Sequence, residues 1–561
     1  MKRVTRILCL LLAMLLLVGC VSTGDNTETT APETTSGAAL DTQPTEPKTA
    51  ALTEAAIAEI SKLGESPDDN YRTWYEIFVY SFCDSDGDGI GDLQGVISKL
   101  DYLENLGING IWFMPIHPSQ SYHKYDVADY YAIDPQYGTM EDFEALIAEC
   151  NARDIHVITD LVVNHTGNDN PWFLSAVEYL QNLPEGAEPS VDECEFFGYY
   201  YFNREGGSGY HQVPGTDWYY EGMFSPHMPD LNLGNEAVRA AIRDVMQFWI
   251  DKGVAGFRLD AAKEFYSGKV SANVEVLNWI QTTAQSLKED VYLVAEVWEN
   301  FRTIKEYYTS GITSIFDFAF GNSEGKIISV LRGAGNPNQV SGFATALEQA
   351  DTGYSESNPN YIDAPFLSNH DVGRIAGFCN YDENKIKLAG AMNLFMSGSA
   401  FIYYGEEIGM SGSGNDPSKR APFVWNEARN NGVTNPPPEC TLPEEYRFGS
   451  LETQENDDSS IYNYYRQAIA IRQALPVISH GASKCEVELN KDCISAFRKI
   501  WNDQQCIVLM NINAEAAQVD LSAYADWTLV ASLSADGGAI AMNDTTLELP
   551  PFGVAVLLPK A

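Results

Sequence analysis

The chain has 561 residues, with 35 Lys or Arg against 78 Asp or Glu and a formal net charge of −43. This charge argues against nucleic acid and anionic membrane surfaces as partners, so a neutral substrate is expected. The ten cysteines show no CxxC spacing, which makes a metal cluster an unlikely use of them.

The N-terminal region predicts export. Basic residues precede the apolar run 7–18, which is too short to span a membrane as a mature helix and indicates a signal peptide over residues 1–20. The run ends in Leu17-Val18-Gly19-Cys20, which resembles the bacterial lipoprotein cleavage box, so we expect Cys20 to be lipidated; an ordinary signal with a coincidental cysteine is the alternative. Residues 21–70 are predicted to be a disordered tether, because their first thirty residues hold almost no large apolar side chains.

Short β-rich apolar runs alternate with helical patterns through the middle of the chain. Thr139 and Asn235 are suited to cap two helices whose apolar residues recur at helical spacing, and Gly253 is suited to end the second. This alternation predicts a (β/α)8 TIM barrel, a member of the α/β class, formed by residues 71–165 and 229–478. The eight predicted strands are 76–82, 110–116, 156–163, 255–259, 291–297, 314–318, 364–367 and 400–404.

Two further domains are predicted beside the barrel. Residues 166–228 are rich in Tyr, Gly and Asp with little helical periodicity, which indicates a small inserted domain after the third strand. Its aromatic residues could be sugar platforms, but we favour a role in that domain's core. Residues 479–561 hold short alternating runs typical of a C-terminal antiparallel β domain. The aromatic residues in question are Tyr199, Tyr200, Tyr201, Trp218, Tyr219 and Tyr220.

Polar groups follow several of the predicted strands, where the catalytic residues of such barrels lie. Arg258 and Asp260 are two residues apart and share one side of a strand end. A guanidinium keeps a neighbouring carboxylate ionised, as a nucleophile requires, although a structural ion pair would give the same pattern. Glu296 is flanked by apolar residues, which should raise its pKa and suit it to donate a proton. His165, His370 and Asp371 follow two other strands.

These motifs, in this order, resemble the α-amylase family of glycoside hydrolases, family 13, from about residue 71 to the end of the chain. The resemblance implies that Asp260 is the nucleophile, Glu296 the general acid and base, and Asp371 the carboxylate that holds sugar hydroxyls and stabilises the transition state. In a retaining glycosidase the two reacting carboxyl groups lie about 5–5.5 Å apart.

The resemblance also implies a set of substrate-binding residues. Tyr125, in the motif Ser121-Tyr122-His123-Lys124-Tyr125-Asp126, would stack on the sugar at the cleavage site, unless it packs into the barrel rim. Asp416 and Arg420 belong to a motif after the eighth strand and would reach the same sugar, unless they form a surface ion pair. Neutral imidazoles suit paired hydroxyls. The complete implied set is Tyr125, His165, Arg258, Lys263, His370, Asp416 and Arg420.

Specificity follows from smaller features of the resemblance. The segment Met228-Pro229-Asp230-Leu231-Asn232 is similar to that of neopullulanases, cyclomaltodextrinases and amylases intermediate between them and oligo-1,6-glucosidases. Ala261 is small, which favours α-1,4 over α-1,6 cleavage, whereas Glu264 departs from the Lys-His pair of many α-amylases. We expect an extracytoplasmic, lipid-anchored hydrolase of internal α-1,4 bonds in starch and maltooligosaccharides. A transglycosylating or cyclomaltodextrinase-like enzyme, or a non-catalytic glucan-binding lipoprotein, is the alternative.

An Asp- and Gly-rich loop follows the first predicted strand. Its alternating carboxylates suit a hard, oxygen-preferring cation, and the resemblance implies a structural Ca²⁺. Gly95 stands where an EF-hand has its twelfth-position glutamate, so an EF-hand is not expected. A solvated turn without metal is the alternative. The implied ligands are Asp84, Asp86, Asp88, the carbonyl of Ile90, and Asp92.

Overall fold

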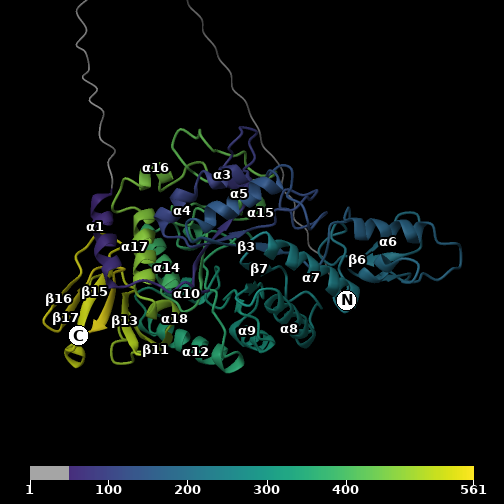
Figure 1. Cartoon of the computed structure of the whole chain (residues 1–561). Helices are drawn as coiled ribbons and strands as arrows, with labels where there is room; N and C mark the ends of the chain where they lie inside the picture. Colours follow the sequence, from purple (N-terminus) through teal and green to yellow (C-terminus); the bar gives the residue numbers. More distant parts are fainter. Residues whose placement is uncertain (1–49, 561) are drawn as a thin grey trace, which may run out of the picture. The chain divides into compact units, whose positions relative to one another are not determined.

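The computed structural model describes residues 50–560, and its largest sheet holds seven parallel strands (Figure 1). The sheet order is β10-β1-β2-β3-β7-β8-β9. The predicted signal peptide, Cys20 and most of the predicted tether lie outside the described residues. The strands are β1 (Thr73–Ile77), β2 (Gly110–Phe113), β3 (His156–Leu161), β7 (Gly256–Leu259), β8 (Tyr292–Ala295), β9 (Ser314–Ile315) and β10 (Ala400–Tyr403).

The predicted strand 364–367 is an extended segment between β9 and β10 that forms only one isolated β-bridge, between Phe316 and Ala364. Pro365 has no N–H to donate to a ladder. Backbone bonds nevertheless join the segment to both neighbours: Asp317 N–H donates to Ala364 O at 3.0 Å, and Phe401 N–H to Pro365 O at 2.8 Å. The segment therefore completes a barrel-like arrangement in the predicted place, which confirms the fold class.

The first predicted strand is wrong in its limits. Ladder pairing ends at Ile77, and Val79–Phe82 forms the short helix α2. The apolar run 76–82 is continuous, and periodicity alone cannot separate a buried strand from a helical turn in so short a run.

The helices around the sheet include both of those predicted from their caps. Thr139 and Asp142 form a capping box at the start of α5 (Met140–Asn151). Asn235 caps α7 (Glu236–Asp251), whose apolar residues are buried. The remaining α-helices of the barrel region are α3 (Leu93–Ile97), α4 (Leu100–Leu106), α8 (Val270–Leu287), α9 (Phe301–Tyr307), α10 (Lys326–Arg332), α11 (Pro337–Val340), α12 (Gly342–Ser357), α13 (Ile375–Phe378), α14 (Glu383–Leu394), α15 (Asp416–Lys419), α16 (Leu451–Gln454), α17 (Ile461–Ala474) and α18 (Val477–His480).

The stretch between β3 and α7 forms its own small sheet, of order β4-β6-β5, with β4 (Phe202–Asn203), β5 (Tyr210–Gln212) and β6 (Tyr219–Glu221). It also contains α6 (Pro171–Gln181), which the sequence reading missed although Asn170 caps it and proline occupies its first position. Four of the six aromatic residues considered as platforms are buried, which supports the core interpretation for them: Tyr199, Tyr200, Trp218 and Tyr220.

The C-terminal region forms two antiparallel sheets with a core of their own beneath them. The larger, ordered β11-β12-β13-β18-β15, contains the alternating runs at 494–497, 506–512, 527–531 and 554–558; the smaller, ordered β14-β17-β16, was not predicted. The strands are β11 (Ala482–Cys485), β12 (Ile494–Trp501), β13 (Gln504–Asn511), β14 (Ala517–Asp520), β15 (Trp527–Leu533), β16 (Ala541–Asn543), β17 (Thr546–Leu549) and β18 (Val554–Pro559).

The predicted tether, residues 21–70, ends too late. Its last part forms α1 (Ala51–Ile60) and a 3-10 turn (Ser61–Leu63), and α1 packs against α17. Glu54 forms an ion pair with Arg466 at 2.7 Å, and Ile60 is buried. The packing partner lies some 400 residues away in the chain, so local composition could not reveal it.

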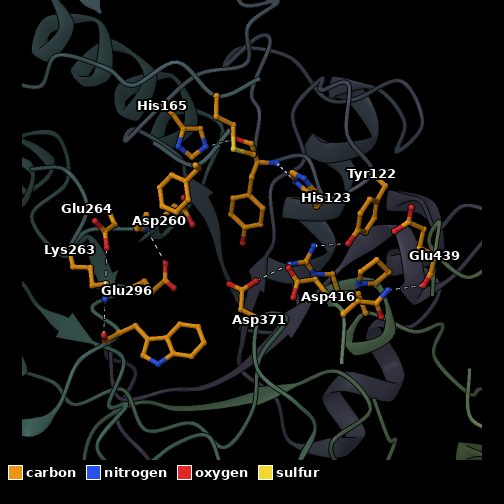
Figure 2. Close-up of a pocket in the computed structure, with 18 residues that line it drawn as sticks. Tyr122, His123, His165, Asp260, Lys263, Glu264, Glu296, Asp371, Asp416 and Glu439 are labelled. Atoms are coloured by element: carbon orange, nitrogen blue, oxygen red, sulfur yellow. Dashed lines mark hydrogen bonds and ion pairs between the residues drawn. The ribbon is translucent and has the colours of Figure 1, made fainter. Parts of the chain in front are cut away.

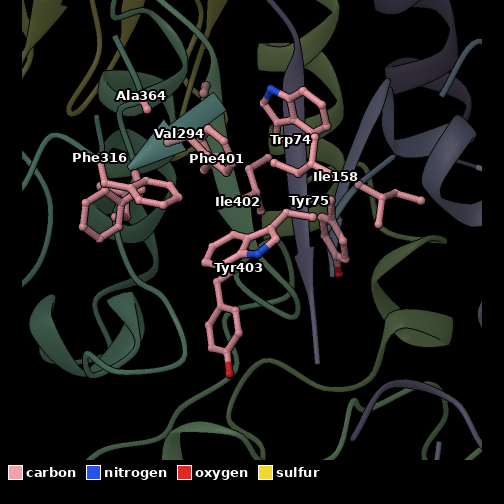
Figure 3. Packing of buried hydrophobic residues seen from close by; sticks show 14 of the residues in the cluster. Trp74, Tyr75, Ile158, Val294, Phe316, Ala364, Phe401, Ile402 and Tyr403 are labelled. Carbon is pink, nitrogen blue, oxygen red and sulfur yellow. The ribbon is translucent and has the colours of Figure 1, made fainter. Parts of the chain in front are cut away.

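Aromatic side chains fill the barrel interior below the strand ends (Figure 3). The ring of Phe401 lies 4.8 Å from that of Phe316 and 6.0 Å from that of Trp74, centroid to centroid. Because side chains fill the barrel interior at this level, open space remains at the carboxyl ends of the described strands. None of the helices among residues 50–560 combines the length and the apolarity that a membrane crossing needs.

Candidate active site

A cavity of about 790 Å³ opens at the carboxyl ends of the barrel strands (Figure 2). Its walls come from the segments after β2, β3, β6, β7, β8 and β10, from the segment after residue 367, and from the segment between α15 and α16, so residues distant in sequence meet there. The lining residues are Tyr122, His123, Tyr125, His165, Phe224, Met228, Asp260, Ala261, Lys263, Glu264, Glu296, Trp298, Asp371, Asn415, Asp416, Pro417, Arg420 and Glu439.

The Arg258 guanidinium joins three carboxyl groups at the floor of this cavity. Its Nη1 lies 2.6 Å from Asp260 Oδ1 and 2.5 Å from Asp160 Oδ1, and its Nη2 lies 2.9 Å from Glu296 Oε2. Arg258 is fully buried, so it fixes these side chains from below and does not itself line the cavity. The sequence had placed Arg258 among the substrate-binding residues; in the structure its guanidinium contacts the three carboxyl groups and, at 3.4 Å, the Tyr125 hydroxyl.

One guanidinium cannot neutralise three carboxylates, which leaves a proton to be shared among them. Burial raises the pKa of Glu296, against the opposing effect of Arg258. Burial also raises the pKa of Asp160, to about 7. Asp260 keeps the closest contact to the guanidinium among the two carboxyl groups that line the cavity. The site therefore presents one carboxyl group suited to donate a proton beside one held next to a cation.

The backbone after Asp260 locks this pair in place. Ala261 has φ +46°, a left-handed conformation that costs a non-glycine residue energy. In that conformation its N–H donates to Glu296 Oε2 at 2.9 Å, and the N–H of Ala262 donates to Glu296 O at 3.1 Å. The strain thus serves to tie the loop after β7 to the loop after β8.

Asp371 lies between two basic groups on the other side of the cavity. Arg420 Nη2 is 2.8 Å from its Oδ1, and His370 Nε2 is 3.0 Å from its Oδ2. Despite burial, the charges of His370 and Arg420 hold the pKa of Asp371 well below its usual range. His370 is fully buried, with both ring nitrogens engaged inside the protein, so the neutral, sugar-facing imidazole expected from the sequence is not what the structure shows.

Tyr125 and His165 do line the cavity, as expected. The Tyr125 hydroxyl contacts Asp160 Oδ2 at 3.3 Å and His370 Nε2 at 2.7 Å, which fixes the ring. His165 Nε2 lies 3.2 Å from the Tyr125 carbonyl oxygen, and burial lowers the pKa of His165, so this imidazole is neutral.

Lys263 and Glu264 lie at one end of the cavity (Figure 2), and Trp298 also belongs to its lining. Lys263 Nζ donates to Trp298 O at 3.2 Å. The Trp298 ring is 43% exposed and stacks on Phe318 with centroids 5.0 Å apart. Sequence reasoning treated Trp298 only as an apolar neighbour of Glu296, although a tryptophan just after a catalytic strand end was the available signal for a sugar platform.

The opposite end is formed by Tyr122, Asp416, Arg420 and Glu439 (Figure 2). Asp416 Oδ1 pairs with Lys419 Nζ at 2.9 Å, and Asp416 also lines the cavity, so the ion pair does not remove Asp416 from the site. Glu439 was missed, because nothing in the irregular segment around it indicates that it returns to the barrel. Its carbonyl accepts a hydrogen bond from Asn415 Nδ2 at 2.9 Å.

The acidic loop after α2 brings the carboxylate oxygens of Asp84, Asp86 and Asp88 within 4.8 Å of one another. Gly87 and Gly89 supply the left-handed turns, with φ +89° and +91°. The donor set is all oxygen, which fits Ca²⁺. Asp92 is not in this group: it caps α3, accepting from Gly95 N at 2.7 Å and from Ser85 N at 2.8 Å. The backbone N–H of Ile90 donates to Asp88 Oδ1 at 2.7 Å.

Comparisons with known proteins agree with this geometry. A family model described as the α-amylase catalytic domain matches residues 76–481. Alpha-amylase 3 of Dictyoglomus thermophilum is 40% identical over 446 residues, which are 78% of this chain and 84% of that protein. The oligo-1,6-glucosidase of Bacillus cereus is 29% identical over 528 residues, covering 80% of this chain and 91% of that protein.

Two solved structures are similar to this chain over most of its length. Amy13B of Eubacterium rectale has a TM-score of 0.87 and 44% identity, covering 90% of this chain and 99% of that chain. The α-amylase from H. orenii has a TM-score of 0.75 and 34% identity, covering 88% of this chain and all of that chain.

Proposed function

We propose, since this chain belongs to the α-amylase family of glycoside hydrolases, that it hydrolyses internal α-1,4 bonds of starch and maltooligosaccharides with retention of configuration. The observation that carries the proposal is the Arg258-centred cluster, which places Asp260 and Glu296 side by side in the cavity with different electrostatic surroundings.

In this mechanism Asp260 attacks the anomeric carbon while Glu296 gives its proton to the leaving oxygen. The Arg258 guanidinium lies 2.6 Å from the nucleophile Asp260, and burial favours the protonated form of Glu296. After the leaving group departs, Glu296 takes a proton from a water molecule, whose oxygen attacks the anomeric carbon and breaks the bond between the sugar and Asp260. Asp371, held anionic by His370 and Arg420, stabilises the positive charge that develops on the sugar ring.

Chain-internal cleavage is supported by the length of the cavity. Lining residues extend beyond the reacting carboxylates in both directions, toward Trp298 at one end and toward Asp416 at the other (Figure 2). The carboxylates outnumber the cations along the walls, which favours neutral glucans over phosphorylated sugars. Ala261, the small residue after the nucleophile, supports α-1,4 specificity, as does the name of the 40% identical relative, Alpha-amylase 3.

A time course of products from soluble starch and from a short maltooligosaccharide tests the proposal. The full chain should release shorter maltooligosaccharides, and Asp260→Asn should release none, while Asp244→Asn, a matched change on the exposed surface of α7, should behave as the unmodified chain. Products longer than the input would mean transglycosylation. No turnover on these glucans, with turnover on pullulan or cyclodextrins, would replace the assigned substrate by that of a neopullulanase or cyclomaltodextrinase.

We also propose that the acidic loop binds a structural Ca²⁺ through Asp84, Asp86 and Asp88, where it would hold the loop together without taking part in the reaction. One millimolar Ca²⁺ should raise Tm by about 3 °C over EGTA. Asp86→Asn should abolish that rise, and Asp503→Asn, in an exposed turn between β12 and β13, should preserve it. Equal Tm values in Ca²⁺ and EGTA for the unmodified chain would contradict a metal site.

A further inference from the structure

Glu76 is a buried glutamate beneath the cavity, and nothing in the chemistry described so far uses it. It lies on β1, in register with Trp112 of β2 and Tyr403 of β10, and is 2% exposed. Its Oε1 lies 2.5 Å from His370 Nδ1, the single side-chain hydrogen bond that Glu76 makes within residues 50–560. A buried carboxylate without a partner would be strongly destabilising, and the hydrogen bond to the His370 imidazole offsets this cost.

Both nitrogens of His370 face oxygen atoms. Nδ1 faces Glu76, and Nε2 lies 3.0 Å from Asp371 Oδ2 and 2.7 Å from the Tyr125 hydroxyl. Ionised carboxylates only accept hydrogen bonds, and the Tyr125 hydroxyl donates its one hydrogen to Asp160 Oδ2 at 3.3 Å. A ring placed among these groups therefore needs a hydrogen on each nitrogen. That species is the imidazolium.

We propose that Glu76 is a positioning residue that keeps His370 protonated and thereby gives Asp371 a second cationic partner beside Arg420. The proposal deepens the hydrolase function above and rests on it. With the ring protonated at both nitrogens, Asp371 lies between two cations: His370 Nε2 is 3.0 Å from its Oδ2, and Arg420 donates to its Oδ1 at 2.8 Å. Asp371 is then fixed both as an anion and in orientation, without contacting Glu76.

The electrostatic surroundings of His370 agree with this assignment. Burial alone would lower its pKa, but the charges of Asp371 and Glu76 raise it to about 9. Burial also raises the pKa of Glu76 itself. The proposal places the shared proton on His370 Nδ1 and not on Glu76 Oε1. The titratable or charged groups that face this pair from the surrounding strands and loops are Tyr125, Asp160, Arg258, Asp371, Tyr403, Tyr404 and Arg420.

Glu76→Gln removes the charge and retains an oxygen that accepts from Nδ1–H. We expect it to lower the pKa of His370 from about 9 toward the ordinary histidine value. The ratio of kcat/KM between the variant and the unmodified chain should then be close to one at acidic pH and fall by about tenfold between neutral pH and about pH 9, where only the variant's imidazole has lost its proton. Taking the ratio cancels the titration of Glu296, which both proteins share.

Glu407→Gln is the matched control, since Glu407 is also buried but bonds to Tyr75 of β1 and Tyr102 of α4 and not to His370. Its ratio should not vary with pH. A pH-independent ratio for Glu76→Gln, whether near one or uniformly low, would overturn the proposal.

An NMR titration of the full chain labelled with ¹⁵N-histidine separates this proposal from the substrate assignment, because it needs no turnover. The His370 signals, identified by their loss in His370→Gln, should show imidazolium at pH 7 in the unmodified chain and titrate at lower pH in Glu76→Gln. An unprotonated Nδ1 at pH 7 in the unmodified chain would place the proton on Glu76. That result would overturn the proposal even if starch is hydrolysed.

Discussion

At the scale of single residues, two carboxyl groups of the site, those of Asp260 and Glu296, have different surroundings. Asp260 and Glu296 share one guanidinium, yet Asp260 sits 2.6 Å from Nη1 whereas Glu296 shares its Oε2 between Nη2 and the backbone N–H of Ala261. The three carboxyl groups around Arg258 carry more negative charge than one guanidinium balances. A proton is therefore retained among them, and burial favours the protonated forms of Glu296 and Asp160. This is the physical basis for assigning Glu296 as the acid.

The assignment predicts a split between substrates for Glu296→Gln. On maltooligosaccharides, kcat/KM should fall by about 10³-fold, because the leaving alkoxide needs a proton. On a nitrophenyl maltooligoside, whose leaving group departs without one, the initial burst of nitrophenol should stay within about tenfold of the unmodified chain. Rapid-mixing absorbance measurements check this.

The pH dependence has a definite sign. The raised pKa of Glu296 keeps the acid protonated to higher pH than an ordinary glutamate, so kcat/KM of the unmodified chain should fall as pH rises through that pKa. The variant should lack this alkaline decline on the nitrophenyl substrate. An equal loss on both substrates would show that Glu296 acts in some way other than proton donation to the leaving group.

At the scale of elements, α1 is a helix that packs against the folded protein although its residues were predicted to belong to a disordered tether. Its backbone is anchored where Thr53 N–H donates to Asp458 Oδ1 at 2.7 Å, and Ile60 joins the main hydrophobic core. Leu52, on the same helix, is 74% exposed. The two side chains therefore provide an internal comparison.

Ile60→Ala should lower the free energy of unfolding by about 2–4 kcal/mol, whereas Leu52→Ala should change it by less than about 0.5 kcal/mol. Urea unfolding of both variants, followed by tryptophan fluorescence, measures the difference, and kcat/KM should stay unchanged because α1 is remote from the lining of the cavity. If α1 belonged to a tether, the two substitutions would be equally neutral.

Sequence patterns predicted what depends on local order and missed what depends on distant contacts. The caps at Thr139 and Asn235 act on the helices that follow them directly, and both helices were predicted. The docking of α1, by contrast, depends on α17. Likewise, the motif containing His370 predicts its presence in the site, but its charge and direction depend on Glu76, almost 300 residues earlier in the chain.

At the scale of the whole molecule, the charge of −43 bears on how the chain meets a membrane. An acidic protein is repelled by anionic lipid surfaces, so peripheral electrostatic binding cannot hold it there. We propose that attachment instead depends on a lipid at Cys20, which lies outside the described residues, and that the protein is exported and anchored at the outer face of the cell membrane.

Cys20→Ser should therefore move the protein from the membrane fraction to the culture medium or periplasm when it is produced in a bacterial host. Cys9→Ser, in the apolar run of the same predicted signal, is the matched control and should leave the protein with the membranes. High salt should not release the anchored form, because charge attraction plays no part in its binding, whereas detergent should. Immunoblots of the fractions measure both effects. Membrane attachment that survives Cys20→Ser but is lost in high salt would show that charge, and not lipid, holds this acidic chain.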